Sequence, residues 1–222
     1  MTLFRTVPAF LVRLLALDSI LVIATSIGGI ALDARWLAVA LFHLWFLAEL
    51  CLERRSGSSS SSEEDRGSRY LLTAVRDLCI VVPVALSGLS HGTEHPLLLP
   101  GGLLMFAGGM ALRFGAMQSL GNRFTMSLTR QTQYALNTQG LYRHMRHPGY
   151  LGLLGIYTSF SLVCGAVGTG VVLGLVTVAA LRYRIRLEEY LLVRTFGAAY
   201  LDYRARTWAL VPRWAQSERE AA

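Results

Sequence analysis

The sequence contains no lysine, and all 21 of its basic residues are arginine. Charged residues make up only 16% of the chain, whereas about a quarter is usual in soluble domains. Hydrophobic residues make up 53%, and this balance argues against a soluble domain and indicates a single membrane domain. The exclusive use of arginine is explained by GC-rich coding rather than by a physical need, and it favours a bacterial source.

Cysteine is scarce, and this argues against two further classes of protein. Cys51, Cys79 and Cys164 stand singly in apolar surroundings, without the paired spacing of a zinc site or a disulfide framework. The segment His91 to His95 has two imidazoles four residues apart, but an internal glycine and the following Pro96 disfavour a helix there. We therefore expect a loop at this segment and no metal site.

Apolar runs long enough to cross a hydrocarbon core of about 30 Å recur along the chain. Four of them precede residue 118: roughly Pro8 to Leu32, Trp36 to Leu52, Tyr70 to Ser90 and Leu97 to Met117. A fifth run, Tyr150 to Leu181, is too long for one crossing, and its glycine-rich segment Gly165 to Gly170 predicts a turn. The sequence therefore predicts an all-α, polytopic integral membrane protein with about six transmembrane helices and a C-terminal helical hairpin.

The distribution of arginine predicts the orientation of these spans. Arginine collects on the cytoplasmic side of a membrane, and with the N-terminus inside only Arg35 would lie on an outer loop. The net charge of +7 is then explained by topology, so no nucleic-acid partner is expected. The hairpin ends near Tyr150 and Leu181 would face the cytoplasm, at the plasma membrane of a bacterium or at the endoplasmic reticulum of a eukaryote.

Ionisable residues within the predicted spans are costly and need an explanation. Most are simplest as charge pairs or as side chains that reach the interface: Arg13, Asp18, His43, Glu49, Arg76 and Asp77. Arg113, one turn from the cytoplasmic end of the fourth span, is a candidate to reach a functional site.

Polar groups are concentrated where the hairpin begins, at Arg146 to Pro148, which we call its first foot. Pro148 suits the first turn of a helix, and the preceding His147 is pushed towards an extended backbone. A helix that begins there offers unpaired N–H groups and a partial positive charge, and Arg146 and His147 add donors. This foot therefore predicts a site for a carboxylate or a phosphate.

The second foot, the segment around Arg184 and Glu188 where the hairpin ends, carries both charges and aromatic rings. Arg184 and Glu188 share a helix face at i, i+4, so a surface helix with ion pairs is one interpretation. The other is an amphipathic cytoplasmic helix, rich in tyrosine, that lies on the membrane and closes over a pocket. In that case a carboxylate could accept ribose hydroxyls or balance a cationic ligand.

An ordered set of motifs occupies the C-terminal half of the chain. Its parts are Leu120-Gly121, Gly140-Leu141-Tyr142, Arg146 to Gly152, Arg184, Glu188-Glu189, Phe196-Gly197 and Tyr200-x-x-Tyr203. In this order and spacing the set resembles the isoprenylcysteine carboxyl methyltransferase (ICMT) family. The resemblance covers residues 118–213, expected as the methyltransferase core, after N-terminal transmembrane helices at 1–117 and before a tail at 214–222. A flexible Ser-rich cytoplasmic loop is expected at 53–69, with no fixed structure from Ser56 to Gly67.

The resemblance implies a membrane enzyme that binds S-adenosylmethionine on the cytoplasmic side and methylates the carboxylate of a prenylated cysteine or a similar lipophilic acid. By motif, its cofactor site would contain Tyr134, Leu136, Asn137, Tyr142, His147, Pro148, Gly149, Tyr150 and Glu188. Arg184 falls on the family's substrate-contacting arginine, with Glu189 beside the substrate and Arg146 as a second catalytic candidate. At Tyr134 and Asn137 the family often has histidine and valine.

Methyl transfer from a sulfonium to a carboxylate cancels opposite charges, so a site that removes both from water favours it and no base is required. The rings of Tyr142 and Tyr150 can favour the sulfonium by cation–π contact.

Three other functions remain open at this stage. N-methylation of an amine phospholipid would need a base such as Glu189 or His147. An NADPH-dependent membrane reductase can carry an Arg-His-Pro-x-Tyr element, although without the later motifs found here. A transporter or scaffold would use the charged feet only for topology, but no inverted repeat is visible.

Overall fold

The structure is a computed structural model, and it describes residues 19, 22–23, 34–55, 65–89, 96–121 and 135–211. Within these ranges every regular element is helical, which confirms the all-α prediction. The elements are α2 (Ala34–Arg55), α3 (Ser68–Leu89), α4 (Leu98–Leu120), the 3-10 helix η3 (Gly140–Arg143), α5 (Pro148–Val163), α6 (Val167–Phe196) and α7 (Ala198–Arg206). The first predicted span, Pro8 to Leu32, lies almost wholly outside the described residues.

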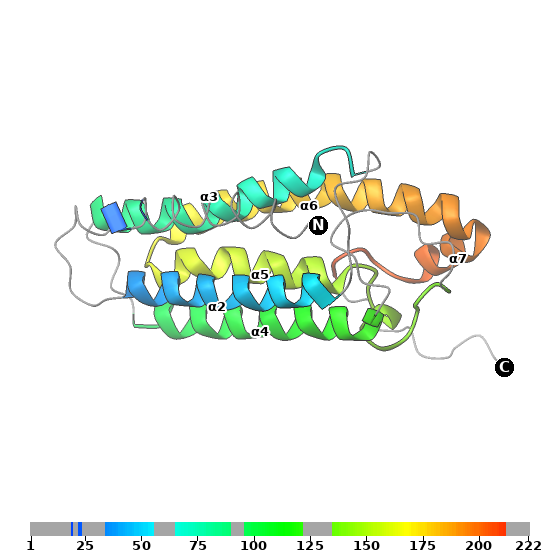
Figure 1. Ribbon diagram of the computed structural model, residues 1–222, viewed down its shortest axis with the longest axis horizontal. Coiled ribbons are helices and arrows are strands. Elements are labelled where there is room, and N and C mark those ends of the chain that lie inside the picture. Colours follow the sequence, from blue (N-terminus) through cyan, green and yellow to red (C-terminus); the bar gives the residue numbers. More distant parts are fainter. Residues whose placement is uncertain are drawn as a thin grey trace, which may run out of the picture.

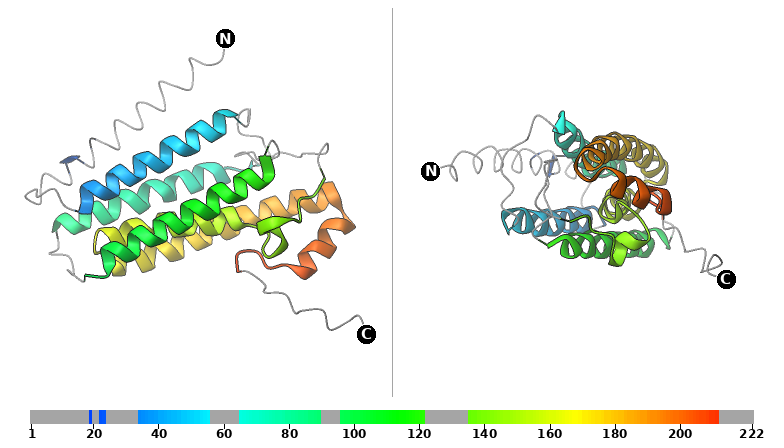
Figure 2. Two further views of the ribbon diagram at one scale, coloured as in Figure 1. Left: turned by 90° about the horizontal axis from the view of Figure 1, so that it is seen from below. Right: turned by 90° about the vertical axis from the view of Figure 1, so that its right-hand side faces the viewer.

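The long helices run side by side, with α5 in the middle (Figure 1). Helix α5 packs against α2, α3, α4 and α6, and α3 also packs along α6. Seen along the bundle, α7 folds back across the end of α6 (Figure 2). The residues before and within the first turn of α5 are therefore enclosed between α4, α6 and α7.

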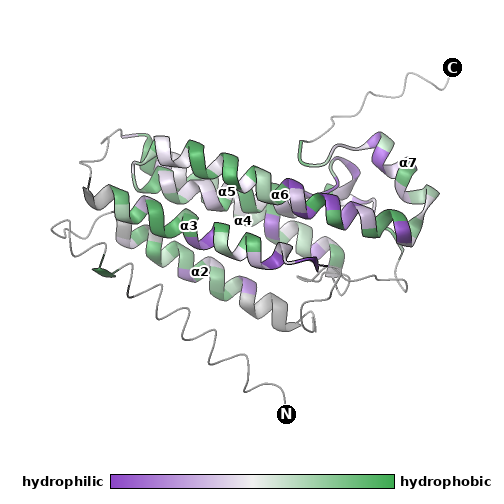
Figure 3. Cartoon of the chain, turned by 90° about the horizontal axis from the view of Figure 1, so that it is seen from above, coloured by the Kyte–Doolittle hydropathy of each residue, from purple (hydrophilic) through white to green (hydrophobic). Residues whose placement is uncertain are grey.

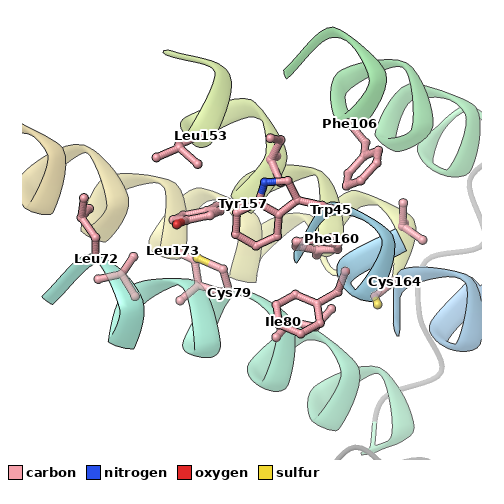
Figure 4. Packing of buried hydrophobic residues seen from close by; sticks show 14 of the residues in the cluster. Trp45, Leu72, Cys79, Ile80, Phe106, Leu153, Tyr157, Phe160, Cys164 and Leu173 are labelled. Atoms are coloured by element: carbon pink, nitrogen blue, oxygen red, sulfur yellow. The ribbon is translucent and has the colours of Figure 1, made fainter. Parts of the chain in front are cut away.

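The core forms where apolar faces of α2, α3, α5 and α6 meet (Figure 4). Trp45 of α2 packs edge-on against Tyr157 of α5, with ring centroids 5.6 Å apart. Phe160 and Ile156 of α5 are fully buried within the same cluster. Burial of large aromatic side chains stabilises such a bundle, so this layer anchors α5 and the polar residues at its start.

Helices α4 and α5 approach closely because glycines face each other. A Cβ atom on Gly152 would lie 2.6 Å from the carbonyl oxygen of Gly109, and one on Gly109 would lie 2.7 Å from the carbonyl oxygen of Gly152. Real Cβ atoms essentially never come so close to a backbone atom. The absence of both side chains therefore permits this contact, as small residues do in membrane helix pairs.

The predicted helical hairpin is confirmed. Helix α5 ends at Val163, Gly165 adopts a positive φ of 69°, and α6 begins at Val167. A positive φ is costly for residues with a Cβ atom, so glycine suits this turn. Helix α6 has 30 residues and α5 has 16, so the second half of α6 extends beyond the start of α5, at the end away from the turn.

By length and composition, one described helix, Leu98–Leu120, could cross a membrane. Apolar side chains also cover much of the outer surface: Leu104 is 74% exposed and Leu175 is 66% exposed. Figure 3 shows hydrophobic residues along the body of the bundle and hydrophilic residues on the second half of α6 and in α7.

Of the charge pairs expected within the spans, that of Arg76 with Asp77 is present, whereas the pair of Arg113 with Glu49 was not predicted. Arg113 of α4 and Glu49 of α2 form a buried ion pair of 2.6 Å, and Arg76 binds its neighbour Asp77 at 2.7 Å. Arg113 lies beneath the start of α5 but is held by Glu49. Arg13 and Asp18 lie outside the described residues.

The expectation of no fixed structure from Ser56 to Gly67 is wrong for its last three residues. Asp65 is buried, with 1% of its surface exposed, and Arg66 and Gly67 form a turn with positive φ before α3 begins at Ser68. Asp65 accepts hydrogen bonds from the Ser68 hydroxyl and the Arg69 backbone, as an N-terminal cap does. These bonds order Asp65 despite its Ser-rich surroundings. Residues 56–64 and the segment His91 to His95 lie outside the described residues.

Candidate active site

The two feet of the hairpin meet at one end of the bundle. Pro148 occupies the first turn of α5, as its fixed φ predicts, and His147 precedes it with φ −129°. Gly149 lies against α4, where an added Cβ would come within 3.2 Å of the Arg113 guanidinium. This tight packing fixes where α5 begins and holds His147 and Tyr150 towards α6.

Tyr150 joins the feet. Its hydroxyl donates a hydrogen bond of 2.6 Å to Glu188 Oε2 and accepts one of 3.0 Å from Arg184 Nε. Its ring stacks on His147, with centroids 5.5 Å apart and an angle of 16° between the rings. His147 Nδ1 lies 3.7 Å from the same oxygen of Glu188. The structure thus brings four of the predicted site residues together.

His147 is buried and incompletely satisfied. Its Nε2 atom lies 3.4 Å from Glu189 Oε1, which is longer than an ordinary N–H···O bond. This nitrogen has no hydrogen-bond partner of ordinary geometry among the described residues. The side chain of Glu188 is 31% exposed, so its carboxylate is accessible to a ligand.

Arg184 is held by the start of α3. Its Nη1 atom donates to Asp65 Oδ1 at 2.6 Å and to the Ser68 hydroxyl at 2.8 Å. Only 4% of Arg184 is exposed. Sequence reasoning missed Asp65, since it stands within a Ser-rich polar segment and no pattern linked it to α6.

Arg146 and Glu189 pair with each other. Arg146 Nε donates to Glu189 Oε1 at 2.7 Å, and Arg146 Nη1 donates to the backbone oxygens of Arg204 and Thr207. Burial alone would raise the pKa of Glu189, but the contacts with His147 and Arg146 lower it to about 2. Glu189 is therefore ionised at neutral pH, and the pair ties the motif to α7.

The segment after α7 forms hydrogen bonds with the motif at the first foot. The backbone N–H groups of Arg146 and His147 donate to the carbonyl oxygens of Trp208 and Ala209, each at 2.9 Å. Tyr203 of α7 donates to the carbonyl oxygen of Tyr142 at 2.6 Å. Tyr203 is part of the sequence motif and could be identified from it. Trp208 and Ala209 contribute backbone oxygens, which any residue has, so the sequence could not identify them.

The remaining predicted cofactor residues precede α5. Asn137 donates to the carbonyl oxygen of Ser119 at the end of α4 and accepts from the backbone of Gln139. Leu136 and Tyr142 are half-buried, and the Tyr142 hydroxyl lies 3.5 Å from the carbonyl oxygen of Ala116. Tyr134 lies outside the described residues.

A known protein family matches this same region. Residues 102–194 match the model of the isoprenylcysteine carboxyl methyltransferase (ICMT) family. Protein-S-isoprenylcysteine O-methyltransferase A of Arabidopsis thaliana is 35% identical over 115 residues, which cover 50% of this chain and 57% of that protein. The mouse protein-S-isoprenylcysteine O-methyltransferase is 36% identical over 110 residues, or 47% of this chain and 38% of its own length. The chain therefore spans about half the length of the curated relatives it matches.

The fold has a solved counterpart. The structure of the eukaryotic intramembrane Ras methyltransferase ICMT aligns with a TM-score of 0.57 over 88% of this chain and 73% of that chain. The sequence identity is 22%, so this likeness concerns the fold.

In its described residues the protein is a helical bundle whose fold is like that of the solved ICMT structure, with a polar site at the feet of its C-terminal hairpin. Residues 102–194, which carry both feet, match the ICMT family model, and about half of the chain is similar to curated protein-S-isoprenylcysteine O-methyltransferases.

Proposed function

We propose that this protein is an S-adenosylmethionine-dependent methyltransferase of the membrane that O-methylates the carboxylate of a prenylcysteine or a similar lipophilic acid. The observation that carries the proposal is the convergence of His147, Tyr150 and Glu188 within the segment that matches the family.

The residues at the feet suit such a methyl donor. Glu188 offers an accessible carboxylate, which can accept hydroxyl hydrogen bonds or balance a positive charge. His147 faces Glu188 through Nδ1, and its buried Nε2, on the side of Glu189, has no hydrogen-bond partner of ordinary geometry among the described residues. When bound, S-adenosylmethionine would supply a sulfonium methyl group. Its remaining proposed contacts are Leu136, Asn137, Tyr142, Pro148, Gly149 and Tyr150, together with Tyr134 from the resemblance alone.

Arg184 is proposed to orient the acceptor carboxylate. It is a buried positive charge next to Tyr150, and charge attraction strengthens where water is excluded. A carboxylate needs no base to attack a methyl group, so the task of these side chains is to hold the two reactants in line. Arg146 and Glu189 support the site by fixing His147 and α7 rather than by touching the reactants.

The low pKa of Glu189 favours carboxylate methylation over amine methylation. An amine acceptor must lose a proton, and Glu189 was one of two candidate bases. With a pKa of about 2 and an ion pair to Arg146, it is a very weak base at neutral pH.

We also propose six membrane crossings, with the N-terminus and the site on the cytoplasmic side. Supporting this placement are the apolar α4, the exposed apolar residues of α4 and α6, and the gathering of hydrophilic residues at the site end of the bundle. A lipophilic acceptor would then reach the feet of the hairpin from the lipid side.

The test uses the purified full-length protein in detergent with methyl-labelled S-adenosylmethionine. A prenylcysteine analogue and phosphatidylethanolamine are offered separately as acceptors. We expect label on the prenylcysteine analogue in a form released by mild base, as a methyl ester requires. Label confined to the amine lipid, and stable to base, would overturn the proposal.

A further inference from the structure

Asp65 is a buried carboxylate that the proposed reaction does not use. It lies immediately before α3, far in sequence from the family motif, yet it contacts Arg184 on α6 at 2.6 Å. Burial alone would raise the pKa of Asp65, but the Arg69 backbone, Arg184 and Ser68 lower it below its usual value. The group is therefore a fixed negative charge that faces the buried guanidinium.

Arg184 also has a second carboxylate within reach of its helix face. Glu188 follows it by four residues on α6, and residues of opposite charge with this spacing lie close enough to pair directly. In this structure Arg184 Nη1 is directed to Asp65 instead, and the Tyr150 hydroxyl stands between Arg184 Nε and Glu188 Oε2.

The donor and acceptor chemistry of Arg184, Tyr150 and Glu188 determines the direction of the hydrogen bonds between them. A guanidinium can only donate, so the Tyr150 oxygen accepts from Arg184. An ionised carboxylate can only accept, so the Tyr150 proton points to Glu188. Asp65 thereby holds the end of a directed series that runs through Arg184 and Tyr150 to Glu188.

We propose that Asp65 is a positioning residue that holds Arg184 away from Glu188 and so keeps the charge of Glu188 available to the cationic methyl donor. The inference rests on the proposed function. A carboxylate already paired with a guanidinium offers less to a second cation, because part of its charge is neutralised and its oxygens are occupied. Without Asp65, the nearest full negative charge for Arg184 among the residues of this series is Glu188.

The test is calorimetric titration of the full-length protein with S-adenosylmethionine, without an acceptor. In Asp65→Asn, Arg184 turns to Glu188, and we expect the Kd to rise about tenfold, the equivalent of losing one charge-assisted contact. Asp65→Glu keeps the charge and should restore binding to within about threefold of wild type. Ser68→Ala is a matched control that removes a neutral partner of both groups, and its Kd should also change less than about threefold.

A double variant separates this role from simple support of the fold. Arg184→Gln in the Asp65→Asn background removes the cation that would compete for Glu188. Its Kd should therefore lie closer to that of wild type than the Kd of Asp65→Asn. If Asp65→Asn alone does not fold, the double variant carries the test, because it leaves no unpaired charge from this couple, and it should bind within about fivefold of wild type.

The outcomes distinguish the two proposals. Failure of the wild-type protein to bind S-adenosylmethionine would overturn the proposed function. If the wild type binds, this inference alone is overturned by equal affinity in Asp65→Asn, by equal losses in Asp65→Asn and Asp65→Glu, or by a double variant weaker than Asp65→Asn. If Asp65→Asn does not fold, a Kd of the double variant more than about fivefold above that of wild type would overturn the inference.

Discussion

Tyr150 on α5 donates a hydrogen bond of 2.6 Å to Glu188 on α6, and this bond joins the two feet of the hairpin. Tyr150 also stacks on His147 and accepts from Arg184. One hydroxyl thus connects the motif before α5 with the charged half of α6, and the proposed donor site is built around it.

Replacement of Tyr150 by phenylalanine should weaken the donor site without unfolding the protein. The ring and its stacking on His147 remain, but Glu188 loses its donor, so we expect the Kd for S-adenosylhomocysteine to rise about tenfold. Calorimetric titration measures this. Tyr190→Phe is the matched control, since Tyr190 lies on the same helix as Glu188 and is 54% exposed. Equal affinities in both variants would contradict the role given to Tyr150.

Replacement of Gly152 by alanine should destabilise the α4–α5 contact. The new Cβ would meet the backbone of Gly109 at 2.6 Å, so the helices must separate, at a cost of about 1–3 kcal/mol in the free energy of unfolding. Gly108→Ala is the control on α4, because nothing lies within 4 Å of a Cβ there. That change should be neutral or stabilise by up to about 1 kcal/mol. Denaturation in detergent measures both, and a stable Gly152→Ala protein would contradict the close packing.

The ion pair between Arg113 and Glu49 predicts a different pattern of stability. Glu49→Gln removes the carboxylate from a buried guanidinium and should lower the free energy of unfolding by about 3–5 kcal/mol. Replacing both residues by apolar ones, as in Glu49→Leu with Arg113→Met, should cost much less, because no buried charge is left. Thermal denaturation of the two proteins compares them. Equal losses would show that the pair contributes little as a pair.

Glu189 makes stability dependent on acidic pH. Its pKa is lowered from 4.5 to about 2 on folding, so its contribution is fully present above about pH 4.5 and is lost as the pH falls towards 2. Within this window the wild type should lose about 1–3 kcal/mol more than Glu189→Gln, which cannot titrate there. Denaturation curves between pH 2 and 6 measure the difference. Parallel pH profiles of the two proteins would contradict the pairing of Glu189 with Arg146 and His147.

Local chemistry made a large part of this architecture predictable. Pro148 marks the start of α5 through its fixed φ, and the glycines near Gly165 mark the turn before α6. Long apolar runs predict helices, because a helix satisfies its own backbone hydrogen bonds where water is absent. The contact of His147 and Tyr150 with Glu188 followed from the order of the motifs, since a hairpin brings its two feet together.

Partners from distant segments could not be found in this way. Asp65 approaches Arg184 from the turn before α3, and Thr207, Trp208 and Ala209 reach the motif through backbone atoms that have no residue-specific signal. The i, i+4 spacing favoured a direct pair between Arg184 and Glu188, but the packing of α3 along α6 places Asp65 at the guanidinium. Periodicity along one chain segment describes which face of a helix is apolar or charged. Which opposite charge meets that face depends on how separate helices pack, and that is a property of the whole fold.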